Sequence, residues 1–154
     1  MYLPSAEVLK LLGYRTAKAI VLTERNPEEK LFVYILINAI EDVMVHQSDR
    51  KSSLIKCEAH NWLIGMSEEF CNTCEFGLLN PIMVQSSYQQ AIKDRKIKFT
   101  QRQIQWKKYH NTYKTFKKSD DKEKRRNKGM LRRLRQQVLQ SSTSFVSTLF
   151  LSVI

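Results

Sequence analysis

The sequence predicts an all-α protein, in which a compact helical bundle is followed by a basic helical extension. Three observations favour this fold class. The 154 residues include only 4 Gly and 3 Pro, apolar residues recur at helical spacing, and few alternating runs typical of strands occur. Short connections between successive helices favour a bundle of four or five. We therefore expect a helical domain over residues 1–92, a basic helical arm over 93–140 and a Ser/Thr-rich apolar tail over 141–154.

The first part of the chain contains clear helix starts. Residues 5–12 predict a short amphipathic helix capped by Ser5, whereas residues 16–23 are compatible with either a second helix or a short strand. Asn26 and Pro27 supply the N-cap and first position of a long helix that we expect to reach about His46. Because residues 31–37 are apolar on nearly every side, we expect this helix to form the buried centre of the domain.

The stretch from Ser67 to Lys93 predicts two short helices joined by a tight turn. It follows a helix expected over residues 53–64, in which Trp62 is expected to pack in the core. Ser67 is the expected N-cap of the first short helix, and Gly77 is expected to end it in the left-handed conformation. Asn80 and Pro81 then start the second helix. This succession is typical of a helix-turn-helix-like hairpin over residues 67–93, and the alternative is a purely structural αα-hairpin.

A family resemblance rests on Ala59, Trp62-Leu63, Phe70, Cys74, Gly77-Leu78 and Asn80-Pro81. This succession resembles a recurring pattern in small helix-turn-helix-type proteins of phage and prophage-like elements from alphaproteobacteria. The resemblance covers about residues 28–90 and implies DNA-linked regulation in a mobile element. The chain departs from the pattern after Pro81, where an Arg-rich continuation is usual. The polar residues expected to contact DNA from the second helix are Gln85, Ser86, Gln89, Gln90 and Lys93.

Positive charge is concentrated after the hairpin. Residues 93–135 contain 18 Lys/Arg and 4 Asp/Glu, a net charge of +14, whereas the rest of the chain carries a net charge of −3. This asymmetry predicts a polyanionic partner, most often nucleic acid, because basic side chains release counterions from a phosphate backbone. The cations expected to contact phosphates are Arg95, Lys107, Lys108, Lys117, Lys118, Arg125, Arg126, Arg132 and Arg133.

Within the arm, we expect one helix over residues 100–117 and a second, strongly basic amphipathic helix from Met130 onward. Residues 120–128 are charged on all sides and are expected to form a hinge or solvated turn. Aromatic residues among the cations are able to stack on unpaired bases, which keeps RNA and single-stranded DNA open as ligands. They are Phe99, Trp106, Tyr109, Tyr113 and Phe116. The tail is expected to dock on the core, to pair with another copy, or to have no function.

A structural zinc site is the main competing interpretation. Cys57-x-x-His60 and Cys71-x-x-Cys74 have the local spacing of zinc ligands, but both pairs fall in helices with apolar partners. We therefore expect buried free thiols, no metal and no cofactor. Three cysteines without an apparent signal peptide favour a reducing cytoplasm. No phosphate-binding glycine loop, HExxH or GxSxG motif occurs, so we expect no catalytic residues and no enzyme.

The combined pattern predicts a DNA-binding regulator of the helix-turn-helix type, with duplex DNA as its partner. One alternative is an RNA- or ribonucleoprotein-binding protein that uses the basic aromatic arm, with the hairpin merely structural. Another is a zinc-stabilised adaptor of a nucleic-acid machine such as RNA polymerase. Self-association is compatible with either, and no membrane partner is expected because no stretch reaches the about 18 apolar residues that a span requires.

Overall fold

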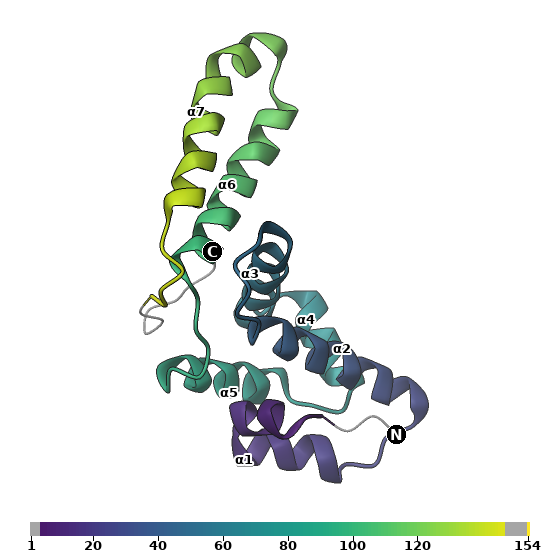
Figure 1. Cartoon of the computed structure of the whole chain (residues 1–154). Coiled ribbons are helices and arrows are strands. Elements are labelled where there is room, and N and C mark those ends of the chain that lie inside the picture. Colours follow the sequence, from purple (N-terminus) through teal and green to yellow (C-terminus); the bar gives the residue numbers. More distant parts are fainter. Residues whose placement is uncertain (1–3, 147–153) are drawn as a thin grey trace.

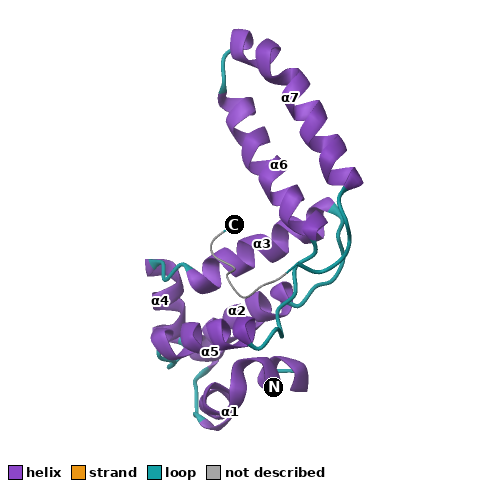
Figure 2. Cartoon of the chain, turned by 90° about the vertical axis from the view of Figure 1, so that its left-hand side faces the viewer, coloured by secondary structure: helices purple, strands orange, loops and turns teal. Residues whose placement is uncertain are grey.

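The computed structural model describes residues 4–146 and residue 154, and these form seven α-helices (Figure 1). Five of them build a body: α1 (Ala6–Leu22), α2 (Pro27–Val43), α3 (Arg50–Ile64), α4 (Glu68–Phe76) and α5 (Pro81–Lys93). The other two, α6 (Gln101–Lys118) and α7 (Asp121–Gln140), lie side by side as a hairpin that projects from the body (Figures 1 and 2). The predicted all-α class is confirmed. None of the described helices is long and apolar enough to cross a bilayer.

The helix starts follow local capping rules, and the predicted caps are confirmed. Asn26 forms a capping box with Glu29, in which each side chain bonds the backbone of the other residue at 2.8 Å. Ser67 Oγ accepts a hydrogen bond from the Phe70 amide at 3.2 Å. Helix α1 spans both segments expected near the N-terminus, with a kink at Gly13 (φ +81°), so the strand alternative for residues 16–23 is wrong.

The hinge expected over residues 120–128 is also wrong, because this segment is the first half of α7. Asp120 caps the helix by accepting a hydrogen bond from the Glu123 amide at 2.8 Å. Asp121 and Glu123 then place negative charge in the first turn, where the helix dipole stabilises it. Charge on all sides therefore reflects a solvated helix rather than a break between helices.

Helix α2 is less buried than its composition suggests. Its inner face packs through Val33, Leu36, Ile37, Ile40 and Val43, which are all buried. On its outer face, Leu31 is 57% exposed and both Tyr34 and Ile35 are about 40% exposed. The expectation that this helix forms the buried centre of the domain therefore holds for its inner face only, because its neighbours α1, α3 and α4 leave one face uncovered.

In the turn between α4 and α5 (Figure 1), the residue with the left-handed conformation is not the expected Gly77. Leu78, rather than Gly77, adopts the left-handed conformation (φ +60°), and the amides of Leu78 and Leu79 bond back to Glu75 and Cys74 at 3.0 and 2.8 Å. Gly77 has an ordinary φ of −86°. Its small size is needed for packing, since a Cβ there would lie 3.0 Å from the Val33 Cγ2 atom of α2.

Two apolar clusters stabilise the body and the projecting hairpin separately. The body cluster extends from Val8 to Phe99, so it includes Ile97 and Phe99 beyond the expected domain end at residue 92. Trp62 packs against this cluster, with its ring 5.0 Å from the Phe70 ring in an edge-on arrangement. The hairpin cluster consists of Trp106, Tyr109, Leu131 and Val138.

The hairpin is attached to the body through carbonyl groups of the α2–α3 connection, residues 44–49. Gln103, at the base of α6, is fully buried and donates to the carbonyls of Val45 (3.4 Å) and Gln47 (2.8 Å). Trp106 Nε1 donates to the Ser48 carbonyl at 3.1 Å. From α3, the buried Lys56 Nζ donates to the carbonyls of Val45 (2.5 Å) and Lys98. These bonds define a joint that holds α2, α3 and α6 together.

The described part of the tail docks on the body. The Val146 amide donates to the Phe99 carbonyl at 2.9 Å, and Thr100 pairs with Phe145 in a single antiparallel bridge. At the last residue, Ile154 exchanges two hydrogen bonds with the Asn61 side chain, at 2.6 and 2.9 Å. Docking is thus the alternative that applies to residues 141–146 and 154, and residues 147–153 lie outside the described part.

The joint predicts an unusual pH dependence of stability. Burial lowers the pKa of Lys56 to about 8 from its ordinary 10.5, so the unfolded chain binds this proton more tightly than the folded one. The contribution of Lys56 to the free energy of unfolding should therefore rise between pH 8 and 10.5. Relative to a Lys56→Met variant, the wild type should gain about 1 kcal/mol between pH 7 and 9, measured by urea unfolding.

The neighbouring Cys57 contributes to the free energy of unfolding with the opposite pH dependence. Subtracting the value of the variant from that of the wild type cancels this contribution. Burial raises the pKa of Cys57 to about 11, so its contribution falls as the pH rises through this range in both proteins. A stability difference between wild type and variant that stays constant from pH 7 to 9 would contradict burial of a charged Lys56.

Candidate nucleic-acid interface

The whole net positive charge of the chain lies on the α6–α7 hairpin. Residues 101–140 contain 14 Lys/Arg and 3 Asp/Glu, a net charge of +11, which equals the net charge of the whole chain. The remaining residues contain 12 of each sign and are neutral. The structure therefore places the charge on an element that projects from a neutral body (Figure 1).

The aromatic residues of the hairpin are used internally. Trp106 and Tyr109 are 7% and 8% exposed, and their rings meet edge-on at 5.8 Å. Tyr109 stacks on Tyr113 at 6.3 Å, and the Arg50 guanidinium of α3 lies 5.5 and 5.7 Å from these two ring centres. Phe99 is completely buried in the body. These contacts remove Trp106, Tyr109 and Phe99 as stacking platforms for unpaired bases.

Most of the expected phosphate contacts are solvent-exposed side chains. Arg95 is exposed beyond α5, where it adopts the left-handed conformation (φ +58°) that ends the helix. Lys107 differs, because it is buried against α3, close enough to Cys57 to influence the pKa of that thiol. We therefore exclude Lys107 from the interface. The exposed cations of the hairpin are Lys108, Lys117, Lys118, Arg125, Arg126, Arg132 and Arg133.

The arginines divide into those used for structure and those available to a ligand. Arg25 donates to the carbonyls of Gly77, Ile20 and Ala19 at 2.7, 2.7 and 3.1 Å, and Arg102 donates to those of Leu139 and Ser141 at 3.0 Å. Within the described part of the chain, the exposed arginines of α7, at positions 125, 126, 132 and 133, donate to no backbone carbonyl in this way. Their guanidinium groups can therefore donate hydrogen bonds to water or to a ligand.

On α5, the expected DNA-reading residues do not have equal roles. Gln85 is half-buried, and its side-chain amide donates to the Ile64 carbonyl at the end of α3, at 2.8 Å. It is therefore a packing residue, and its expected exposure is wrong. Gln90 is exposed and donates to Asp94 at 2.9 Å. Ser86, Gln89 and Lys93 are exposed.

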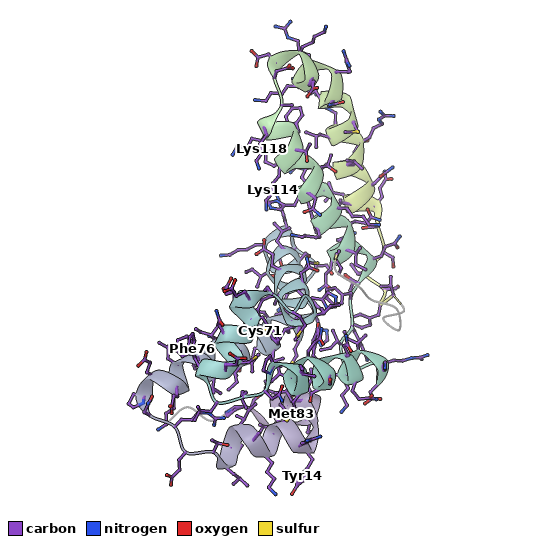
Figure 3. All side chains as sticks on the ribbon, turned by 180° about the vertical axis from the view of Figure 1, so that it is seen from behind. Tyr14, Cys71, Phe76, Met83, Lys114 and Lys118 are labelled. Atoms are coloured by element: carbon purple, nitrogen blue, oxygen red, sulfur yellow. The ribbon has the colours of Figure 1, made fainter. Side chains whose placement is uncertain are left out.

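One side of α5 is covered by α1. The side chains of Thr16 and Ser87 form a hydrogen bond of 2.5 Å between the two helices. Met83 of α5 is half-buried (Figure 3), and it lines a pocket together with Ser87 and residues of α1. The surface that α5 can offer to a groove is thus a strip that includes Ser86, Gln89 and Lys93.

The four possible zinc ligands do not converge. Cys57 is buried and its thiol faces the Gln103 carbonyl at 3.8 Å, while His60 Nδ1 forms a buried hydrogen bond of 2.6 Å with the Tyr88 hydroxyl. Burial raises the pKa of Cys74 to about 12, and Cys71 is half-buried near the Met66 carbonyl at 4.0 Å (Figure 3). No group of three or more metal-ligating side chains occurs among the described residues.

The hairpin carries further exposed cations that were not among the expected phosphate contacts. Lys114 lies, like the predicted Lys118, on the side of α6 that faces away from α7 (Figure 3), and on α7 Lys122, Lys128 and Arg135 are exposed. Lys114 follows Lys107 by seven residues and so shares its face of α6. Since α3 covers this face only at the base of the hairpin, the pattern alone cannot separate the buried Lys107 from the exposed Lys114.

The two glutamines of α5 provide a direct stability test. We expect Gln85→Ala to lower the free energy of unfolding by about 1 kcal/mol, because the Ile64 carbonyl loses its side-chain donor. Gln89→Ala should change it by less than about 0.5 kcal/mol, as for other exposed sites. Urea unfolding of the two variants measures both effects, and equal effects would contradict the packing role of Gln85.

No family model, curated protein or solved structure matches this chain. The resemblance to helix-turn-helix proteins of phage-like elements therefore stays a prediction, and a functional argument must come from the geometry of the interface.

Proposed function

We propose that this protein binds duplex DNA through the α6–α7 hairpin and acts as a DNA-binding regulator. The observation that carries this proposal is the set of exposed cations on a projecting hairpin attached to a neutral body. Lysine and arginine side chains neutralise phosphates and release counterions, which supplies affinity without dependence on sequence. The joint at residues 44–49 holds the base of the hairpin in a defined orientation, so that its cations act together.

Burial of the aromatic residues favours a duplex over a single strand. Proteins that bind single strands combine a basic groove with exposed aromatic rings on which successive bases stack. Here Trp106 and Tyr109 form the core of the hairpin and the half-buried Tyr113 and Phe116 pack against them, so its surface offers charge with little exposed ring area for stacking. A duplex presents its phosphates outward and requires no such platforms.

The exposed strip of α5 is the candidate for sequence readout. Glutamine can form two hydrogen bonds with adenine in the major groove, and Gln89 is exposed on this helix. The hairpin of α4 and α5 would then work as a helix-turn-helix unit, while α6 and α7 supply phosphate contacts. The proposal assigns affinity to the basic hairpin and selectivity to α5.

The role of the hairpin can be tested with two variants of equal charge. The first replaces Lys117, Lys118, Arg125 and Arg126 at the tip of the hairpin with Gln. The second replaces the exposed body residues Lys10, Lys18, Lys30 and Lys51 with Gln. If all four tip cations contact phosphates, the slope of log K against log salt should become less steep by roughly 3 to 4, because each contact contributes about 0.9.

The body variant should bind duplex DNA with nearly the wild-type slope. Affinities are measured by fluorescence anisotropy over a salt series, for duplex DNA, single-stranded DNA and structured RNA. Equal slopes for the two variants would contradict a specific role of the hairpin. Tighter binding of single strands or of structured RNA than of duplex DNA would contradict the choice of partner.

Sequence readout by α5 predicts a selective effect of Gln89→Ala. The variant should lose roughly 1–3 kcal/mol of binding free energy on a preferred site that is selected from a random DNA pool. Binding to random DNA and the salt slope should be unchanged, because glutamine carries no charge. Gln85→Ala serves as the matched control on the same helix. A loss of the same size on both DNAs would show that α5 does not read sequence.

A further inference from the structure

The outer face of α7 carries an arrangement of arginines around one glycine. Residues 125, 126, 129, 132 and 133 fall on one side of the helix, because residues three, four and seven apart lie on the same face. The opposite side packs on α6 through the buried Leu131 and Val138, with the half-buried Leu134 beside them. Arg125, Arg126, Arg132, Arg133 and Gly129 are all exposed.

Gly129 has no role in packing that the structure reveals. A Cβ atom added at this position would meet nothing within 4 Å. Glycine in the middle of a helix is destabilising relative to alanine, and α7 extends for 20 residues around this one. Glycine at this position therefore lowers the stability of the helix, and no packing contact within the described residues explains its presence. It lies in the middle of the most basic surface of the chain.

We propose that a phosphodiester strand of a nucleic-acid duplex crosses α7 over Gly129, held by the pair Arg125 and Arg126 on one side and the pair Arg132 and Arg133 on the other. The two pairs are seven residues apart, which corresponds to about 10 Å along the helix axis. Arginine binds phosphate oxygens through two parallel hydrogen bonds, so each pair can hold neighbouring phosphates. The absence of a side chain at Gly129 lets the strand approach the helix backbone closely.

The surroundings of this face favour nucleic acid over an anionic membrane. Helices that bind at a membrane surface insert an apolar face beside their basic one. The apolar face of α7, formed by Leu131, Leu134 and Val138, is already occupied by the aromatic side chains of α6. The exposed Met130 and Leu139 are nine residues apart and form no continuous apolar face. The acidic residues of α7, Asp121 and Glu123, lie in its first turn, away from Gly129, where the helix dipole stabilises their negative charge.

This inference rests on the proposed function, and its test separates the two. The experiment uses the full chain and measures binding of a duplex DNA of random sequence, with Gly129→Ala and Gly129→Leu compared with the wild type. Gly129→Ala should raise the melting temperature while it weakens binding about tenfold, the equivalent of about one charge-assisted hydrogen bond. Gly129→Leu should weaken binding further. Neither variant should change the slope of log K against log salt by as much as the about 0.9 that one phosphate contact contributes.

Asn111→Leu is the matched control, because it adds bulk at an exposed position of α6. It should leave duplex binding unchanged. If Gly129→Ala binds as tightly as the wild type, or if Asn111→Leu weakens binding equally, the crossing over Gly129 is refuted while the proposed function stands. If the wild type does not bind the duplex, the proposed function itself fails. Binding to anionic vesicles that is lost in Gly129→Leu, without any duplex binding, would overturn both in favour of a lipid partner.

Discussion

The architecture depends on the hydrogen bonds that side chains of two other helices donate to the carbonyl groups of the α2–α3 connection. Unpaired buried backbone groups are costly, and here the donors come from two other elements. Lys56 of α3 and Gln103 of α6 both donate to Val45, while Gln103 also reaches Gln47 and Trp106 reaches Ser48. One short connection thus aligns α3 with α6 and sets the direction in which the hairpin leaves the body.

Separation of charge from the apolar core is a second constraint. The hairpin carries a net charge of +11, and like charges at this density repel one another. Its folding is supported by the cluster of Trp106, Tyr109, Leu131 and Val138 between the two helices and by caps at both helix starts. The cations remain hydrated on the outside, where a polyanion would relieve their repulsion. The same arrangement that permits folding therefore favours a phosphate-rich partner.

The aromatic residues support the choice between two proposed partners that composition leaves open. Aromatic side chains among lysines and arginines are typical of single-strand binding as well as of an ordinary helical core. Contact with Leu131 and Val138 uses the rings of Trp106 and Tyr109, and Arg50 covers Tyr109 from the side of α3. The surface left for a ligand is mainly positive charge, which suits a duplex.

Local interactions explain what the sequence alone determined. Caps at Ser5, Asn26, Ser67 and Asn80, together with helical apolar spacing, depend on residues close in the sequence and were predictable, as were the all-α class and the location of the charge. Tertiary structure decided which faces are covered. Leu31 is exposed, Gln85 bonds to α3, and Lys107 is buried beside Cys57. Leu78 takes the left-handed position expected for Gly77, while Gly77 packs closely against Val33. These outcomes depend on neighbours distant in the chain, because only packing determines which part of an amphipathic helix meets another element and which part meets water.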